Sequence, residues 1–249
     1  MLTEERHSFI LKRLKENKIV KSQELMKALQ CSESTIRRDL SQLEEKGQLV
    51  RVHGGAKRAY QLEEELSDSE KSSKSIQEKR AIGELAASLV KENDVIFLDA
   101  GTTTMAMIEF LSEKNITVVT NGVVHASLLA DHAVQTFLLG GRVKQSTKAM
   151  VGAASLQDLT NYQFNKAFLG MNGIDLDYGL TTPDPEEGIL KRTALNQSAM
   201  TYVLADDSKW EKVTFSKVAD IEEAAIITNN RDHSLKSYEE KTMILEARL

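Results

Sequence analysis

The sequence SESTIRRDLSQL, residues 32–43, predicts a helix with one buried and one exposed face. Its apolar residues Ile36, Leu40 and Leu43 fall at i, i+4 and i+7, a spacing that places side chains on one side of a helix. Ser32 precedes them as an N-cap, because a serine side chain accepts a hydrogen bond from the first helical turn. The opposite face is therefore free to meet a partner.

Two further helices and a hairpin are expected around this helix. The first helix follows Thr3 as N-cap and the second follows Ser22 as N-cap. Their buried residues are Ile10, Leu11 and Leu14 in the first and Leu25, Met26 and Leu29 in the second. After the third helix, Val50 and Val52 alternate with polar residues before Gly54-Gly55, which is typical of a tight β-hairpin. Residues 1–58 are thus predicted to form a winged helix-turn-helix domain.

The exposed face of the third helix carries groups that suit DNA. Arginine can contact phosphates or guanine edges, and hydroxyls can hydrogen bond to either. The candidate DNA-binding residues are Ser34, Thr35, Arg37 and Arg38 on the helix and Arg51 and His53 on the hairpin. Alternatively, Arg37 pairs with Glu33 at i, i+4 on an ordinary surface helix, which stabilises it by only about 0.3–0.5 kcal/mol.

Charge is unevenly distributed along the chain. The 249 residues carry a net charge of -5, but residues 1–58 hold 13 Lys and Arg against 8 Asp and Glu, a balance of +5. The remaining residues hold 19 against 29, a balance of -10. Local positive charge is the electrostatic feature that binds a phosphate backbone, although a solvated basic face has the same composition.

A linker and a second domain follow the basic region. Residues 59–75 combine Glu63-Glu64-Glu65 with a Ser- and Lys-rich stretch and no apolar period. From residue 76 to 249, helical patterns alternate with short apolar runs, which predicts an α/β domain with a mostly parallel sheet. The expected strands are 95–98, 117–119, 136–139, 166–169, 202–205 and 225–228.

A loop after the first of these strands has the composition of an anion site. The strand 95–98 leads into Asp99-Ala100-Gly101-Thr102-Thr103-Thr104 and then into a helix. Free N–H groups at a helix N-terminus attract phosphate, although the threonines could simply cap the helix. The loop has one glycine and no lysine, so neither a P-loop nor a dinucleotide fingerprint is supported.

Other polar residues are expected at the same edge of the sheet, because ligands of open α/β sheets bind beyond the carboxyl ends of the strands. Asn121, Gly140, Gly141 and Lys209 follow three further strands. Asp184-Pro185 begins a helix that carries two further candidate ligand-binding residues, Glu187 and Lys191, at i, i+4, although such a pair is more often found as a surface salt bridge.

The chain resembles the DeoR family of bacterial sugar-responsive repressors over nearly its whole length. In the first 58 residues the resemblance rests on Arg6, Ile10, Ser32, the run from Thr35 to Leu40 and Arg51-Val52-His53-Gly54-Gly55-Ala56. It implies a sensor domain similar in fold to ribose-phosphate isomerases and CoA transferases that binds phosphorylated sugars.

By the same resemblance, Gly101, Thr102, Thr103 and Thr104 hold the phosphate, and Asn121, Gly140 and Gly141 shape the cavity. Lys209 reaches the phosphate or a sugar hydroxyl. Asp99 accepts hydrogen bonds from sugar hydroxyls or from its own loop, because a phosphate repels a carboxylate. The chain is most similar to fructose-operon repressors, which implies fructose 1-phosphate as effector, operator DNA as partner and a homodimer or homotetramer.

The main alternative is a sugar-phosphate isomerase whose basic head serves oligomerisation, with Glu187 or Asp99 as the carboxylate base. No cofactor is expected, and His125 and His132 lack carboxylates or cysteines at metal-ligand spacing. The single cysteine, Cys31, cannot form an internal disulfide, and there is no leader or run of 18 apolar residues. We therefore expect a cytoplasmic protein that does not enter membranes.

Overall fold

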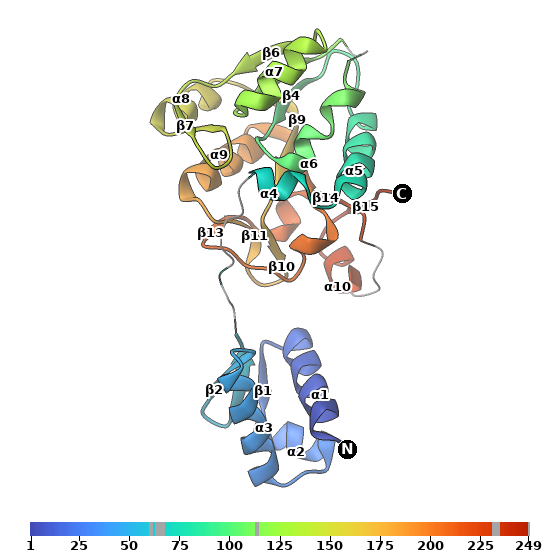
Figure 1. Cartoon of the computed structure of the whole chain (residues 1–249), viewed down its shortest axis with the longest axis vertical. Coiled ribbons are helices and arrows are strands. Elements are labelled where there is room, and N and C mark those ends of the chain that lie inside the picture. Colours follow the sequence, from blue (N-terminus) through green and yellow to red (C-terminus); the bar gives the residue numbers. More distant parts are fainter. Residues whose placement is uncertain (60–61, 63–67, 113–114, 231–234, 249) are drawn as a thin grey trace. The chain divides into compact units, whose positions relative to one another are not determined.

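The computed structural model describes residues 1–59, 62, 68–112, 115–230 and 235–248 (Figure 1), with the backbone alone for residues 15, 16, 68 and 69. The chain divides into two compact units, Met1–Gln61 and Leu62–Leu249. Among the described helices, none is long and apolar enough to cross a bilayer.

The N-terminal unit is a winged helix-turn-helix domain, as predicted. Its elements are α1 (Thr3–Glu16), β1 (Ile19–Lys21), α2 (Ser22–Leu29), α3 (Glu33–Glu45), β2 (Leu49–Val52) and β3 (Gly55–Arg58). The strands form an antiparallel sheet in the order β1-β3-β2. One apolar cluster joins the helices to the sheet and contains Ile10, Leu14, Val20, Leu25, Leu29, Ile36, Leu40, Leu43, Leu49 and Ala56. The predicted buried stripe of α3 is therefore confirmed.

The starts of the three helices differ in detail from the expectation. Ser32 caps α3 as predicted, because its side chain accepts a hydrogen bond from the Thr35 N–H at 3.3 Å. Thr3 and Ser22, expected as N-caps, are instead the first residues of α1 and α2. In α1 the carboxylate of Glu5 accepts a hydrogen bond from the N–H of Leu2 at 2.8 Å. A side chain within the helix thus pairs with a free backbone N–H at the helix start. The short strand β1 was not predicted, since three residues show no clear period.

The C-terminal unit is built on a seven-stranded parallel sheet in the order β15-β14-β12-β9-β4-β5-β6. Its strands are β4 (Val95–Leu98), β5 (Thr117–Thr120), β6 (Gln135–Leu138), β9 (Phe164–Gly170), β12 (Ser198–Leu204), β14 (Ala225–Thr228) and β15 (Ile244–Glu246). Six of them match the expected apolar runs to within a few residues. The seventh, β15, lies at the sheet edge, and its residues are only partly buried or exposed.

Helices cover both faces of this sheet, because successive side chains of a strand point to opposite faces. Ile96 and Leu98 join one apolar cluster, whereas Phe97 between them joins the other. The first face is covered by α5 (Ile76–Ser88), α6 (Thr102–Met105), η1 (Ile108–Phe110) and α7 (Val123–Asp131). The second face is covered by α8 (Ala153–Thr160) and α9 (Pro185–Asn196) (Figure 1).

Two small sheets complete the unit and were not predicted. They consist of β7 (Arg142–Lys144) with β8 (Ala149–Val151), and of β10 (Gly173–Asp175), β11 (Gly179–Thr182) and β13 (Ser216–Ala219). Short helical segments are η2 (Asp207–Lys209), η3 (Ile221–Glu223) and α10 (Lys236–Glu239). Trp210, directly after η2, is buried edge-on against Tyr238 with ring centroids 4.9 Å apart.

Part of the expected linker belongs structurally to the second unit. Leu62 forms an isolated parallel bridge with Val213. Helix α4 (Asp68–Ser72) packs against α6. Residues 60, 61 and 63–67, which include the expected acidic run, lie outside the described residues.

Candidate DNA interface and effector cavity

The exposed face of α3 presents two arginines to solvent. Arg37 and Arg38 are exposed, and neither has a hydrogen bond or ion pair to another described residue. The surface pair of Glu33 with Arg37 is therefore absent from this part of the chain. Ser34 and Thr35 are partly engaged, since both hydroxyls lie 2.9 Å from the Ser32 hydroxyl in the helix cap.

The hairpin of β2 and β3 lies beside α3 and is tied to it. The Arg51 side chain donates a hydrogen bond to the Ser41 hydroxyl at 2.8 Å, and its backbone N–H donates to the Glu44 carboxylate at 2.9 Å. His53 and Gly54 form the two-residue turn, in which Gly54 has a φ of +79°. That angle suits the mirror-image turns of tight hairpins and favours glycine.

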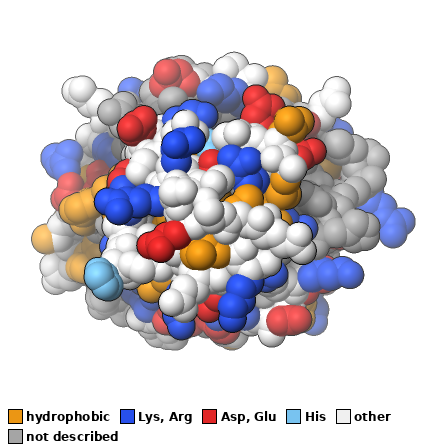
Figure 2. Space-filling model, turned by 90° about the horizontal axis from the view of Figure 1, so that it is seen from below, with side chains coloured by type: hydrophobic (Ala, Val, Ile, Leu, Met, Phe, Trp, Pro, Cys, Tyr) orange, Lys and Arg blue, Asp and Glu red, His pale blue; other side chains and the backbone are white. Residues whose placement is uncertain are grey.

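A groove of about 680 Å³ runs between α2, α3 and this hairpin. Its lining brings Arg37 of α3 together with Arg51 and His53 of the hairpin. Figure 2 shows Lys and Arg side chains on the face that it presents, mixed with acidic and apolar side chains. The groove and its cationic rim have the composition of a phosphate-binding surface.

A buried ion pair fixes α3 against α1. The Arg6 guanidinium donates to both carboxylate oxygens of Asp39, at 2.7 and 2.9 Å, and Asp39 is 1% exposed. A two-bond arginine–carboxylate contact sets orientation as well as distance. Arg6 and Asp39, which both belong to the family-like sequence pattern, thus fix the orientation of α3 from its buried side.

In the second unit, a narrow cavity lies at the carboxyl ends of the central strands. Its lining residues are Lys71, Asp99, Ala100, Gly101, Thr102, Thr103, Thr147, Gly170, Met171, Asn172, Glu187, Lys191, Leu204 and Lys209. The cavity brings together seven of the eleven predicted ligand-binding residues, which are Asp99, Gly101, Thr102, Thr103, Glu187, Lys191 and Lys209. This cavity is called the effector cavity below.

The acidic groups of the effector cavity are paired with lysines. Lys191 forms a buried ion pair with Asp99, whose Oδ2 also accepts the Gly170 N–H at 2.9 Å. Glu187 accepts the Thr147 hydroxyl at 2.7 Å and lies 3.3 Å from the Lys144 ammonium. Lys191 is therefore paired across the cavity with Asp99, and both it and Glu187 are buried rather than part of a surface pair.

Two further predicted residues support the loop from behind. Thr104 is fully buried, and its hydroxyl donates to the Asp99 carbonyl at 2.6 Å and accepts the Gly101 N–H at 3.0 Å. Asn121 accepts the Ala100 N–H at 2.9 Å through its side-chain oxygen. Neither lines the cavity, because these bonds direct both side chains into the protein.

Gly140 and Gly141 lie away from the effector cavity. The Gly140 N–H donates to Asp158 at 3.1 Å, and its carbonyl accepts the Ser155 hydroxyl. Gly141 has a φ of +129°, and a Cβ there would lie 2.3 Å from the Ser155 Oγ. In this structure the two glycines form the tight turn that connects β6 to β7 and packs against α8.

His125 is a supporting residue that sequence reasoning assigned no role. Its Nε2 lies 3.1 Å from the Gly101 carbonyl and 3.2 Å from the Thr104 hydroxyl, directly beneath the loop. Burial lowers the pKa of His125 to about 4, so the ring is neutral and donates from Nε2. The sequence itself did not mark His125 as a supporting residue. In the structure, the glycine at position 122 makes room for the ring, because a Cβ there would lie 2.5 Å from it.

Seven lining residues were missed, and three of them, Lys71, Thr147 and Asn172, have polar side chains. Asn172 lies in the loop between β9 and β10. Lys71 could not be found, since it reaches the cavity only through the packing of α4. No cluster of three or more metal-binding side chains occurs among the described residues.

Two family profiles match the chain in these regions. A DeoR-like helix-turn-helix domain matches residues 6–61, and a DeoR C terminal sensor domain matches residues 74–230. The chain belongs to the DeoR family of transcriptional regulators. The family resemblance expected from sequence is confirmed, and the isomerase alternative is wrong, because both profiles are those of a regulator and not of an enzyme.

Relatives of known sequence support this assignment. The chain is 48% identical over 246 residues to FruR of Bacillus subtilis, described as an uncharacterized HTH-type transcriptional regulator, with 98% of both chains covered. It is 33% identical to the transcriptional repressor GlcR of Bacillus subtilis, covering 93% of this chain and 90% of GlcR. It is 36% identical to the lactose phosphotransferase system repressor of Staphylococcus epidermidis, with 86% of both covered.

Among solved structures, ribose 5-phosphate isomerase A of Methanocaldococcus jannaschii is similar at a TM-score of 0.41 and 18% identity, covering 54% of each chain.

Proposed function

We propose that this DeoR-family regulator represses a fructose uptake or catabolism operon and is released from its operator by a phosphorylated fructose, with fructose 1-phosphate as the first candidate. The observation that carries the proposal is the effector cavity, in which a glycine–threonine loop faces Lys191, Lys209 and paired carboxylates. Cationic and N–H donors suit a phosphate, and buried carboxylates suit sugar hydroxyls. The name of the FruR relative supports fructose as the sugar.

The phosphate is assigned to Gly101, Thr102 and Thr103 together with Lys209, and the hydroxyls to Asp99 and Glu187. Operator DNA is assigned to Arg37 and Arg38 on α3 and to Arg51 and His53 on the hairpin, with Ser34 and Thr35 in supporting contacts. A homodimer or homotetramer matches this assignment, because paired recognition helices read half-sites one helical turn apart.

The direct test measures binding of the full chain to DNA from upstream of its own operon by electrophoretic mobility shift at fixed salt. Fructose 1-phosphate, fructose 6-phosphate and unphosphorylated fructose are titrated into the complex. We expect specific binding that a phosphorylated fructose releases and fructose does not. Specific binding that none of the sugars changes would contradict the effector, and absence of specific binding would contradict the operator assignment. Salt is fixed because phosphate contacts make affinity strongly salt dependent.

A further inference from the structure

A second cavity adjoins the effector cavity and is strongly basic. It has a volume of about 160 Å³ and shares Lys71, Asn172 and Lys209 with the effector cavity. Its charged lining residues are Lys71, Lys74, Lys79, Lys209, Lys212 and Asp206. Five ammonium groups thus surround one carboxylate in a space large enough for a group of several heavy atoms.

The one carboxylate in this lysine cavity is already engaged. Asp206 is 2% exposed, and its Oδ1 accepts hydrogen bonds from both the N–H and the hydroxyl of Ser208. It forms no ion pair with any lysine within the described part of the chain. Asp206 therefore caps the η2 turn, and it is one carboxylate among five lysines in the lining of this cavity.

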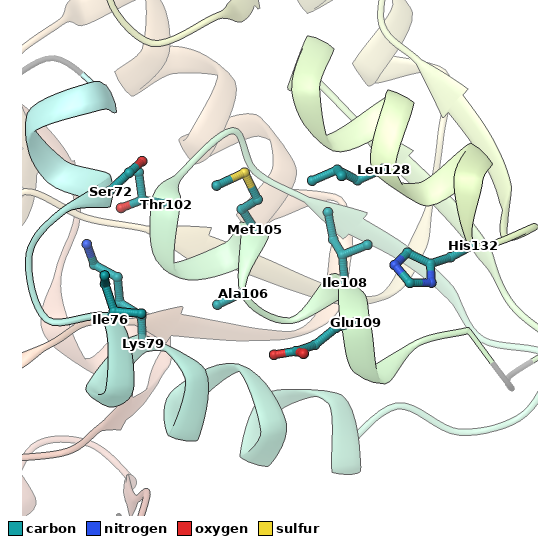
Figure 3. A pocket seen from close by; sticks show the side chains of 10 residues that line it. All are labelled: Ser72, Ile76, Lys79, Thr102, Met105, Ala106, Ile108, Glu109, Leu128 and His132. Carbon is teal, nitrogen blue, oxygen red and sulfur yellow. The ribbon is translucent and has the colours of Figure 1, made fainter.

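The ammonium group of Lys79 is held in a fixed position by backbone hydrogen bonds. It is 6% exposed, and its ammonium donates to the backbone carbonyls of Lys71 and Lys74 at 2.5 and 2.8 Å. Figure 3 shows Lys79 extending from α5 beside Ser72 and Thr102. Burial is the main cause that lowers the pKa of Lys79; the Asp206 carboxylate partly offsets it, and the nearby Lys209 and Lys71 lower the pKa further. A buried ammonium among like charges is costly unless an anion joins it.

The two cavities meet at Lys71 and Lys209, so one molecule can reach both. From these observations we propose that the preferred effector carries a second anionic group, a phosphate or a carboxylate, which binds in the lysine cavity while the first phosphate binds at the Gly101–Thr103 loop. This rests on the proposed function and narrows its ligand class to sugars with an anionic group at each end. Fructose 1,6-bisphosphate is the fructose derivative that meets this condition, and fructose 1-phosphate meets half of it.

The test is calorimetric titration of the full chain at fixed salt with four probes. These are fructose 1-phosphate, fructose 6-phosphate, fructose 1,6-bisphosphate and 6-phosphogluconate, the last of which carries a carboxylate opposite its phosphate. We expect at least one doubly anionic probe to bind about tenfold more tightly than either monophosphate. A gain for the bisphosphate alone identifies a phosphate site, and a gain for 6-phosphogluconate alone identifies a carboxylate site.

Two variants place the second anion. Lys74→Gln removes a charge from an exposed side chain, whereas Lys79→Gln also removes the hydrogen bonds to the Lys71 and Lys74 carbonyls. Both should reduce the preference for the doubly anionic probe about fivefold. Lys91→Gln, at an exposed lysine outside both cavities, is the matched control and should leave the preference unchanged.

Two outcomes overturn the proposal. One is that no doubly anionic probe binds more tightly than the monophosphates. The other is a preference that survives unchanged in Lys74→Gln. If none of the four probes binds, the proposed function itself fails, which is a different result from monophosphate binding without the preference.

Discussion

His125 connects the chemistry of one side chain to the stability of the effector loop. Its pKa of about 4 in the folded protein lies below the ordinary value of 6.5, so between these values the unfolded chain binds a proton that the folded chain does not. Stability should therefore fall as the pH drops from about 6.5 to about 4, with a slope of up to about 1.4 kcal/mol per pH unit from this residue.

Urea unfolding at pH 7, 6 and 5 checks this expectation. His125→Gln should be less stable at pH 7, because the hydrogen bond to Gly101 is altered, but should lose less stability on acidification than the original protein. His132→Gln, at a half-buried histidine outside the loop, is the control and should keep the original slope. Equal slopes in all three proteins would contradict the assignment of a neutral His125.

Thr103 and Lys209 carry the prediction for the effector site. Thr103→Val removes a hydroxyl and keeps the shape, and Lys209→Ala removes a cation that no described carboxylate pairs with. Both proteins should bind operator DNA with unchanged affinity while sugar-phosphate affinity falls about tenfold or more. DNA release by a phosphorylated sugar, titrated on the same operator, is the measurement. Retained release in both variants would refute the proposed cavity.

At the scale of single elements, the proposal makes α3 the main contributor to DNA affinity. Replacing Arg37 and Arg38 by alanine should abolish specific operator binding and lower the salt dependence of the residual binding by about one counterion per lost phosphate contact. Effector affinity should be unchanged, because both arginines belong to the other unit of the chain. Arg80→Ala, at an exposed arginine paired with Glu109 in the sensor unit, is the control. Unchanged operator affinity in the double variant would show that α3 is not the recognition helix.

The elements that sequence could predict are those with a strong period. The strands 95–98 and 225–228 match β4 and β14 in full, because they are continuous apolar runs buried on both faces. The strands β7, β8, β10, β11 and β13 have three or four residues each, and their apolar content does not separate them from loops. Their pairing depends on partners that only the folded chain brings together, as for β11 with β13.

The same distinction applies to the site. Asp99, Gly101 and Thr103 were predictable, since a strand end followed by glycine and hydroxyls has a known geometry. How deeply each side chain is buried could not be predicted. Thr104 and Asn121 were expected at the ligand, but they support the loop and do not line the cavity. Lys71 could not be predicted either, because it lies in a region without a periodic pattern of apolar residues.

For the whole molecule, the two units must be coupled for an effector to act. A ligand shifts an equilibrium only by its difference in affinity for the two states, and that coupling is reciprocal. If the effector weakens operator binding by some factor, saturating operator DNA should weaken effector binding by the same factor. Calorimetric titration of the effector with and without operator DNA measures it. Unequal factors would show that the effector acts on something other than the DNA-binding equilibrium, such as assembly of subunits.

Trp210 gives the protein a built-in optical reporter. It is the single tryptophan of the chain and directly follows Lys209, which lines both the effector cavity and the lysine cavity. Its ring is buried against Tyr238, and its indole N–H donates to the Thr228 hydroxyl at 3.2 Å. All tryptophan emission from the protein therefore originates one residue from the place where effectors are expected. Occupancy of that place can be followed by intrinsic fluorescence, in the unmodified chain and without any label.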